Sequence, residues 1–298
     1  MRMVLSGVYI PAVTPFDEKE ELDCRKLKKN IEKWNCTNIS GYMCLGSNGE
    51  FKMLDEEESC AVIRTFAENR AADKGLIAGV GRESLYHTLR FIEKLERENL
   101  TPDYISVLTP HYFKKMMNDE VLVEYYTRIA DNSPYPVLLY CAPGFANGVP
   151  ISADAVKTRA SHPNIAGIKD TSSDMMEQYM DTVGMRSDFS VMAGSISNLH
   201  KCLKCGGEGG VLSAANYFPD ECAHLFEVWK TQGEAAYSEY ERKLQVRIKK
   251  TGGKRGVSSI KYCMNLLGYE AGRPRSPLPI LNLEEKQEIK NALQIDER

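Results

Sequence analysis

Eight short apolar runs, each followed by polar or glycine residues, constrain the fold of this chain more than any other sequence feature. They cover residues 7–13, 39–45, 76–80, 104–108, 136–141, 165–169, 189–193 and 210–214. Strands that are apolar along almost their whole length are typical of parallel sheets, because both faces of such a sheet are buried. Helical patterns separate the runs, as in residues 83–98 and in residues 55–70, where Asp55 and Glu58 resemble a capping box. This succession of strand–helix units predicts an α/β chain folded as a TIM (β/α)8 barrel.

An open, doubly wound sheet is the competing architecture. The first run lacks the G-x-G-x-x-G loop that would follow it in a dinucleotide-binding fold, and no acidic residue is placed to bind a ribose. After residue 220 only helical patterns remain, interrupted by Gly252 and Gly253 and by the proline-containing segment 274–279. We therefore predict a barrel over residues 1–222 and a C-terminal helical extension, of about three helices, over residues 223–298.

Composition excludes several classes of partner. The 298 residues carry a formal net charge of only -3, which gives no electrostatic footprint for nucleic acid or for an acidic membrane surface. No apolar run approaches the roughly 20 residues that span a bilayer, and the apolar opening, residues 1–13, lacks the basic segment of a signal peptide. We expect neither a nucleic-acid nor a membrane partner.

The cysteines indicate a reducing compartment. Nine is an odd number, and the cysteines show no regular spacing, so we expect reduced thiols and a cytoplasmic location. The C-x-x-C from Cys202 to Cys205 falls in a helical pattern without a second pair. Helix packing explains it better than a structural zinc site, which needs about four ligands.

In a barrel of this kind the functional residues gather at the carboxyl ends of the strands. Those ends carry glycines, hydroxyl groups, tyrosines and one lysine, at residues 14–15, 46–50, 79–81, 109–112, 140, 169, 194–195 and 213–216. No group of Asp, Glu and His has metal-ligand spacing there. We expect no metal and no other cofactor.

Lys169 ends the buried run I-A-G-I-K, and Asp170 to Ser173 resemble the polar start of a helix. Two interpretations are open. Burial in the barrel disfavours the ammonium form, and a neutral amine attacks a ketone to give an iminium, an electron sink for breaking or making the adjacent carbon–carbon bond. Alternatively, Lys169 forms a salt bridge with a carboxylate such as Asp170. The strand position alone favours neither interpretation.

Tyr140 favours the interpretation of Lys169 as a reactive amine. It ends the preceding run P-V-L-L-Y, so adjacent barrel strands would set its phenol beside Lys169. A phenol both donates and accepts a proton, which suits transfer between a substrate oxygen and an amine. A core tyrosine with a satisfied hydroxyl is the alternative, but it leaves the neighbouring lysine unexplained.

The loop G-S-N-G-E, residues 46–50, has two interpretations as well. Its composition is common in plain turns. Its backbone N–H groups, the Ser47 hydroxyl and the Asn48 amide also suit a carboxylate. It is not a phosphate-binding Walker loop, because no Gly-Lys-Ser/Thr follows.

Taken together, four motifs in order make the chain resemble the pyruvate-dependent class I aldolases, the family of dihydrodipicolinate synthase and N-acetylneuraminate lyase. The motifs are G-S-N-G-E after the second strand, L-T-P-H-Y-F at the fourth, L-L-Y-C-A-P at the fifth and G-I-K-D at the sixth. The resemblance runs from about residue 7 to residue 278. S-N-G-E-F, H-P-N-I-A-G-I-K-D, D-F-S-V-M-A-G-S and G-Y-E-A-G-R-P-R-S-P-L look most like the 4-hydroxy-2-oxoglutarate aldolase branch.

The resemblance implies a role for each matched residue. Lys169 would form the Schiff base, Tyr140 would relay protons, and Tyr112 would complete the relay by reaching across a dimer interface. Ser47 and Asn48, beside Gly46, would hold the carboxylate of a small 2-oxoacid such as pyruvate. The remaining implied pocket residues are Thr171, Gly194 and Leu212. The family is typically a homotetramer built from two tight dimers.

Two departures from dihydrodipicolinate synthases matter. These enzymes usually carry an arginine after the fifth-strand tyrosine, and alignment on Tyr140 puts Phe145 at that position. Phenylalanine cannot form the bidentate pair by which arginine binds a carboxylate, which argues against aspartate semialdehyde as substrate. Asn147 replaces a following glycine; either Asn adopts the required positive φ, or the loop is shifted by one residue to Gly148. His111 is either a substrate contact or an exposed rim residue.

The lead hypothesis is therefore a Schiff-base lyase that cleaves or forms a carbon–carbon bond next to pyruvate or a related 2-oxoacid, similar to 4-hydroxy-2-oxoacid aldolases. A dihydrodipicolinate synthase that condenses pyruvate with aspartate semialdehyde is the alternative within the family. A barrel that binds a 2-oxoacid without catalysis is the alternative outside it.

Overall fold

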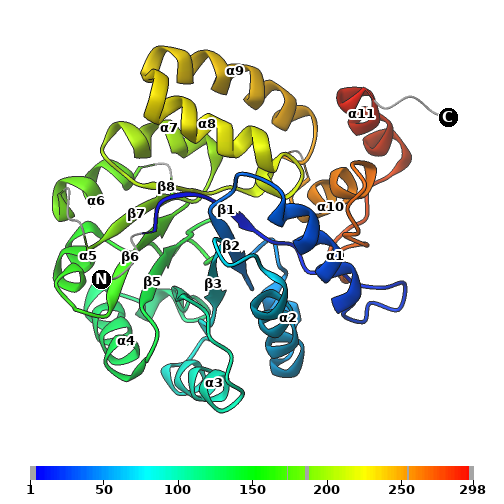
Figure 1. Cartoon of the computed structure of the whole chain (residues 1–298). Helices are drawn as coiled ribbons and strands as arrows, with labels where there is room; N and C mark the ends of the chain where they lie inside the picture. The colour runs from blue at the N-terminus through cyan, green and yellow to red at the C-terminus, as the bar shows by residue number, and fades with distance from the viewer. Residues whose placement is uncertain (1–4, 173, 185–187, 254, 295–298) are drawn as a thin grey trace. The chain divides into compact units, whose positions relative to one another are not determined.

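The computed structural model describes residues 5–172, 174–184, 188–253 and 255–294, and its strands form a closed parallel barrel in the order β1 to β8 (Figure 1). All eight predicted strands are present, which confirms the TIM barrel over the open sheet. Their bounds are β1 (Gly7–Pro11), β2 (Gly41–Cys44), β3 (Gly75–Gly79), β4 (Tyr104–Leu108), β5 (Val137–Cys141), β6 (Ile165–Asp170), β7 (Ser190–Ala193) and β8 (Gly209–Val211).

The structure divides into two compact units. The first is Met1–Gly7 with Gly75–Val211, and the second is Val8–Lys74 with Leu212–Arg298. The division that we predict between residues 222 and 223 stays a prediction.

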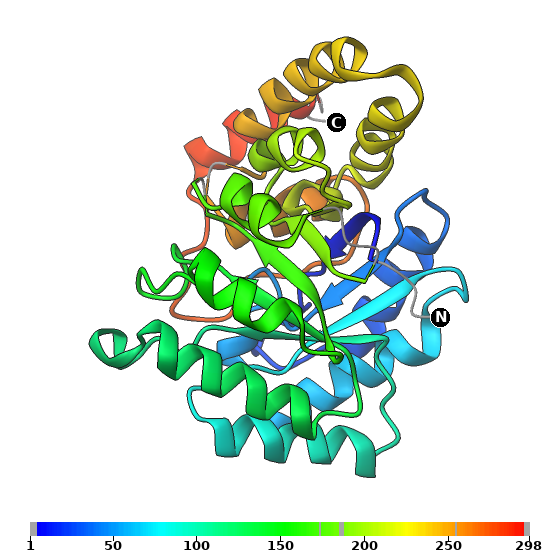
Figure 2. The same cartoon turned by 90° about the vertical axis from the view of Figure 1, so that its left-hand side faces the viewer.

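The first unit contains strands β3 to β8 and the helices between them. These helices are α3 (Leu85–Arg97), η2 (Lys114–Met116), α4 (Asp119–Asn132), α5 (Ala153–Ala160), α6 (Met176–Val183) and α7 (Ile196–Lys204). In Figure 2 the green helices of this unit run alongside its strands. Asp170 is the last residue of β6 and α6 begins at Met176, so the predicted helix start at residues 170–173 is wrong for Asp170; Ser173 lies outside the described residues. Cys202 is fully buried on α7, in agreement with the predicted packing role of the C-x-x-C.

The second unit contains β1, β2 and the C-terminal helices. Its helices are α1 (Cys24–Asn35), η1 (Phe51–Met53), α2 (Glu56–Asn69), η3 (Ser213–Asn216), α8 (Pro219–Gln232), α9 (Glu234–Lys250), α10 (Val257–Leu266) and α11 (Leu283–Leu293). The Asp55–Glu58 capping box is present at α2, as predicted. Gly253 lies between α9 and α10, and the proline segment lies between α10 and α11, so both predicted breaks are confirmed.

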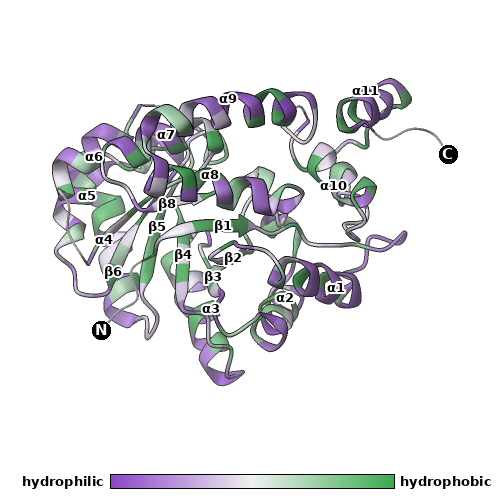
Figure 3. Cartoon of the chain, turned by 45° about the horizontal axis from the view of Figure 1, so that its top comes forward, coloured by the Kyte–Doolittle hydropathy of each residue, from purple (hydrophilic) through white to green (hydrophobic). Residues whose placement is uncertain are grey.

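Hydropathy follows this arrangement. Figure 3 shows hydrophobic residues concentrated on the strands, whereas the helices carry broad hydrophilic faces. Every residue of β4, β5 and β6 is buried, as expected for strands that are covered on both faces. In the described part of the chain, no helix has the length and apolar character required to cross a membrane.

Candidate active site

Lys169 lies near the carboxyl end of β6, directly opposite Tyr140 on β5. The strand register pairs these two residues, and each is only 3% exposed. The Lys169 Nζ atom lies 3.9 Å from the centroid of the Tyr140 ring. The predicted juxtaposition of the two side chains is therefore confirmed.

In the part of the chain that the structure describes, the carboxylate of Asp170, the next residue, contacts Ser172 and not Lys169. Asp170 accepts hydrogen bonds from the backbone N–H of Ser172 at 2.9 Å and from the Ser172 hydroxyl at 2.7 Å. Burial is the main influence on Asp170, and it raises the pKa of that carboxyl. Within the described residues, Lys169 forms no ion pair with Asp170, so the barrel-rim salt bridge is not what the structure contains.

Cys141 and Tyr179 support the strand pair from its other face. The Tyr179 hydroxyl lies 3.4 Å from the Cys141 Sγ atom, and it also donates a short hydrogen bond to the Ile151 carbonyl. Burial raises the pKa of the Cys141 thiol to about 12, so the group is a neutral thiol near pH 7. Sequence reasoning missed this role, although strand alternation places Cys141 and Asp170 on the face opposite to Tyr140 and Lys169.

Gly167 allows β6 to approach β7 closely. A Cβ atom at this position would lie 2.2 Å from the Ser190 carbonyl oxygen, far inside van der Waals contact. Gly167 is two residues before Lys169 on the same face of the strand. Close backbone approach at Gly167 therefore helps to set the position of Lys169.

We predict that Gly167→Ala lowers the free energy of unfolding by about 1–3 kcal/mol, because the added methyl group forces the two strands apart. Urea denaturation measures the effect. Gly144→Ala is the matched control, since a Cβ atom there meets nothing within 4 Å. Equal stabilities of the two variants would contradict this account of the strand packing.

Thr171 and Gly194 lie against each other next to the end of β6. The Thr171 hydroxyl donates to the Cys141 carbonyl at 3.1 Å, and the Gly194 N–H donates to the Asp170 carbonyl at 2.5 Å. A side chain at position 194 would collide with Thr171, because a Cβ atom would lie 2.2 Å from its Cγ2 atom. The structure thus brings together four of the predicted site residues: Lys169, Tyr140, Thr171 and Gly194.

The predicted carboxylate loop, residues 46–50, belongs to the second unit and is held by specific hydrogen bonds. The Asn48 amide donates to the Ser213 hydroxyl at 2.8 Å, and the Thr14 hydroxyl donates to the Gly49 carbonyl at 2.7 Å. Ser213 directly follows Leu212, which is fully buried. The structure therefore connects Asn48 to the segment of Leu212, while Gly46 precedes Ser47 at the start of the same loop.

Glu50, the last residue of this loop, forms a buried ion pair that sequence reasoning missed. The Lys261 Nζ atom lies 2.5 Å from the Glu50 Oε1 atom, and each side chain is only 1% exposed. The Arg275 N–H donates to the Glu50 Oε2 atom at 2.8 Å. Burial lowers the pKa of Lys261 to about 8, and the Glu50 charge opposes this shift.

Arg275 extends the network to α2. Its guanidinium donates two hydrogen bonds to Glu58, at 2.6 and 2.9 Å, which lower the pKa of that carboxyl. Lys261 and Arg275 also lie over the ring of Phe16, at 4.4 and 4.1 Å from its centroid. These contacts fix the loop that carries Ser47 and Asn48 to the C-terminal helices of the same unit.

His111 and Tyr112 lie in the loop after β4. The backbone N–H groups of both residues donate to the Glu83 carboxylate, at 2.9 and 3.0 Å, and the His111 Nδ1 atom lies 2.9 Å from the Thr109 carbonyl oxygen. The Tyr112 side chain is 76% exposed and makes an edge-on contact with Phe113. Within one chain, then, His111 is engaged locally and Tyr112 points to solvent.

Phe145 lies in the loop after β5 and is 62% exposed. Its N–H donates to the Ala142 carbonyl at 2.9 Å, which closes a tight turn. Asn147 has φ 50 and Gly148 has φ 75, so Asn147 adopts the positive φ that we expect for an asparagine in the place of glycine. The loop presents an apolar ring at the position where we looked for an arginine.

Comparisons with known proteins agree with this geometry. Residues 4–296 match the model of the dihydrodipicolinate synthetase family. A probable mitochondrial 4-hydroxy-2-oxoglutarate aldolase from Emericella nidulans is 28% identical, covering 98% of this chain and 94% of its own. A 4-hydroxy-tetrahydrodipicolinate synthase from Brachyspira hyodysenteriae is 26% identical, covering 97% of each chain.

Solved structures show the same fold. A dihydrodipicolinate synthase from Bacillus anthracis has a TM-score of 0.90 at 24% identity and covers 99% of this chain and 100% of its own. A prophage protein of the dihydrodipicolinic acid synthase family from E. coli, solved in complex with pyruvate, has a TM-score of 0.88 at 25% identity and covers 98% of each chain. The family and its named relatives are lyases, which confirms the prediction that this chain is a lyase. The solved structure confirms the (β/α)8 barrel. On the strength of a family match over nearly its whole length, this chain belongs to the dihydrodipicolinate synthetase family.

Proposed function

We propose that this chain is a Schiff-base aldolase that cleaves a 4-hydroxy-2-oxoacid to pyruvate and an aldehyde, or runs the reverse reaction. The observation that carries the proposal is the buried Lys169 at the end of β6, with its amine 3.9 Å from the centre of the Tyr140 ring. A lysine that is buried without an acidic partner on its own strand end suits an amine that reacts in its neutral form.

In the proposed mechanism, the Lys169 amine attacks the ketone carbon of the substrate, and water leaves to give an iminium. Removal of the proton from the 4-hydroxyl group then breaks the C3–C4 bond, so that an aldehyde leaves and the iminium accepts the electron pair as an enamine. Protonation at C3 and hydrolysis release pyruvate and restore the amine. Tyr140 transfers protons between the substrate oxygen and the amine, because its phenol can both donate and accept.

The carboxylate of the substrate is assigned to the loop of Ser47 and Asn48, next to Gly46. This assignment rests on the family resemblance and on the loop chemistry, which offers N–H, hydroxyl and amide donors. Thr171, Gly194 and Leu212 are proposed to line the pocket. No cofactor takes part in the proposed reaction.

The identity of the second substrate depends on Phe145. An exposed phenyl ring lacks the charged donor that dihydrodipicolinate synthases usually offer to the carboxylate of aspartate semialdehyde, and the similarity to a 4-hydroxy-2-oxoglutarate aldolase favours glyoxylate as the aldehyde. A substrate panel tests this: pyruvate release from several 4-hydroxy-2-oxoacids against condensation of pyruvate with aspartate semialdehyde. We expect pyruvate release from 4-hydroxy-2-oxoglutarate; robust condensation instead would identify a dihydrodipicolinate synthase, and neither reaction would favour a 2-oxoacid-binding protein.

Tyr140→Phe should lower kcat by roughly 10²–10⁴-fold, the usual contribution of one positioned proton-transfer group, while the reduced Lys169 adduct still forms. Tyr135→Phe is the matched control. Tyr135 lies just before β5, and its hydroxyl donates to the Leu100 carbonyl, so this substitution should leave kcat unchanged. Steady-state kinetics of both variants measure the difference. A Tyr140→Phe enzyme with wild-type kcat would remove Tyr140 from the mechanism.

We also propose a homotetramer built from two dimers, in which Tyr112 completes the proton relay of a partner chain. Tyr112, Phe113 and Met116 form one exposed apolar segment, with 76, 67 and 67% of each residue accessible, which is typical of a protein interface. Light scattering should report a tetramer, and Phe113→Asp with Met116→Asp should give smaller species with a lower kcat. A monomeric wild-type protein with full activity would contradict this proposal.

The free cysteines lead us to propose a cytoplasmic location, although two fungal relatives are named as mitochondrial proteins.

A further inference from the structure

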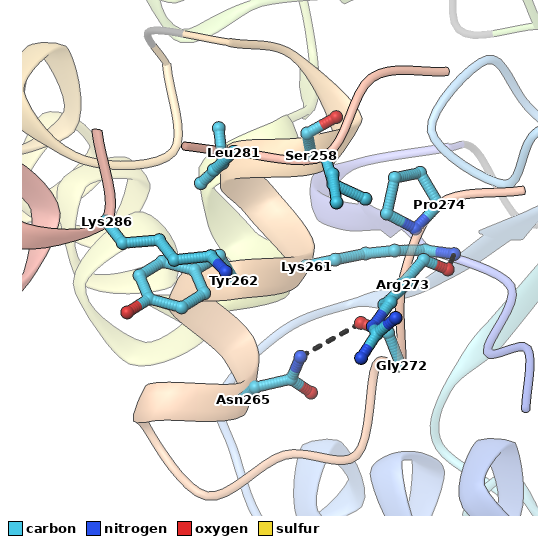
Figure 4. A pocket seen from close by; sticks show the side chains of 10 residues that line it. Ser258, Lys261, Tyr262, Asn265, Gly272, Arg273, Pro274, Leu281 and Lys286 are labelled. Carbon is cyan, nitrogen blue, oxygen red and sulfur yellow. Dashed lines mark hydrogen bonds between the residues drawn. The ribbon is translucent and has the colours of Figure 1, made fainter. Parts of the chain in front are cut away.

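A cavity of about 300 Å³ lies in the second unit, next to helix α10 (Figure 4). This volume is at the small end of the range for sites that bind small molecules. The cavity contains none of the residues that we assign to catalysis or to the substrate carboxylate. Its lining residues come from α10, from the segment after α10 and from α11, and they include Lys261, Asn265, Arg273, Pro274, Leu281 and Lys286.

The lining is cationic. It contains Lys261, Arg273 and Lys286, and none of the ten lining residues is Asp or Glu. In Figure 4, Arg273 and Lys286 reach towards the cavity from opposite sides. A cavity with this balance of charge favours an anionic ligand.

Two of the three cations are available to a ligand. Lys261 is already paired with Glu50 at 2.5 Å. Arg273 contacts Glu18 at 3.2 Å, but both side chains are largely exposed, and such pairs contribute little and exchange readily. Lys286 forms no ion pair within the described part of the chain; its Nζ atom lies 6.0 Å from the centroid of the Tyr262 ring.

The rest of the lining is rigid and partly apolar. Asn265 is held at both ends, since its amide donates to the Gly272 carbonyl at 2.9 Å and its oxygen accepts from the Ala271 N–H at 2.8 Å. Pro274 and Leu281 are buried and offer a hydrocarbon surface. The cavity therefore combines an apolar wall with two separated positive charges.

We propose that this cavity binds a short organic dicarboxylate, with one carboxylate on Arg273 and the other on Lys286. Its hydrocarbon chain would cover Pro274 and Leu281. A ligand held there would lie next to Lys261, whose ammonium holds Glu50 at the end of the loop of Ser47 and Asn48. The proposal concerns binding at a separate place and does not depend on the aldolase activity.

Isothermal titration calorimetry of the full chain with glutarate tests the proposal. We expect saturable binding that Ser47→Ala leaves in place, and a Kd that rises at least about tenfold in Lys286→Gln and in Arg273→Gln, because each change removes a charge-assisted contact. Lys290→Gln is the matched control, since Lys290 lies one turn further along α11 and is absent from the lining; its Kd should equal that of the wild type. Circular dichroism verifies that each variant is folded, and Lys286, on a surface helix, provides the test if Arg273→Gln fails to fold.

Four results would overturn the proposal. Glutarate could fail to saturate the wild type, or Lys290→Gln could weaken binding as much as Lys286→Gln, which would indicate unspecific charge attraction. Ser47→Ala could abolish glutarate binding, which would place the ligand at the substrate loop instead. Inorganic phosphate serves as the comparison anion, and binding as tight as that of glutarate would contradict a site built for a dicarboxylate. Because calorimetry detects binding alone, a protein without aldolase activity would still give a clear answer.

Discussion

Lys169→Ala should lower kcat/KM for pyruvate release by at least about 10⁴-fold, because the variant lacks the only nucleophile that we assign to the reaction. The side chain is buried against Tyr140 and forms no ion pair with Asp170 in the described structure, so its removal should affect chemistry far more than folding. A substrate-binding barrel without catalysis would show no such loss.

The control for this variant is another lysine of the same unit. Lys157 is exposed on α5, and Lys157→Ala should retain wild-type kcat/KM. Urea denaturation of both variants separates a catalytic effect from unfolding. A Lys169→Ala enzyme that is folded and still active within tenfold of the wild type would exclude the Schiff-base mechanism.

Lys261→Met should lower the free energy of unfolding by about 3–5 kcal/mol, since it leaves the Glu50 carboxylate buried without its partner. Methionine keeps the length of the side chain, so the loss comes mainly from charge. The loop of Ser47 and Asn48 should loosen as well, because Glu50 is its last residue. Urea denaturation gives the stability, and the KM for the 2-oxoacid reports on the loop.

Two further variants make this prediction specific. Combining Lys261→Met with Glu50→Gln should restore most of the lost stability, because an uncharged pair carries no unpaired charge. Lys29→Met breaks an ion pair of similar length, 2.6 Å, whose side chains are 61 and 39% exposed, and should change stability little. If Lys261→Met were no more harmful than Lys29→Met, burial of the Glu50 pair would not matter to the fold.

The sequence predicts those parts of the site that depend on strand order. β5 and β6 follow each other in the chain and in the barrel, so Tyr140 and Lys169, near the carboxyl ends of two neighbouring strands, come together through register alone. Strand alternation also assigns Asp170 to the opposite face, although the residue type alone leaves a salt bridge with Lys169 open. Asn147 takes the positive φ that its side chain tolerates, so this local conformation is readable from residue type.

The contacts that the sequence does not predict join residues that are far apart along the chain. Glu50 and Lys261 meet because α10 packs beside the loop after β2 within the second unit, and no periodic pattern specifies that pairing. The roles of Tyr179 and Cys141 depend on how α6 packs on the strand pair, which hydrophobic spacing leaves undetermined. Glu50 also adopts φ 55, a conformation that favours glycine or asparagine. A glutamate at this position therefore does not predict that conformation.

The most direct test of the account is borohydride reduction of the wild-type protein in the presence of pyruvate, followed by intact-mass and peptide analysis. The account predicts one reduced pyruvyl group per chain, on the peptide that contains Lys169, present in Lys157→Ala and absent from Lys169→Ala. No adduct on the wild-type protein, or an undiminished adduct in Lys169→Ala, would contradict it.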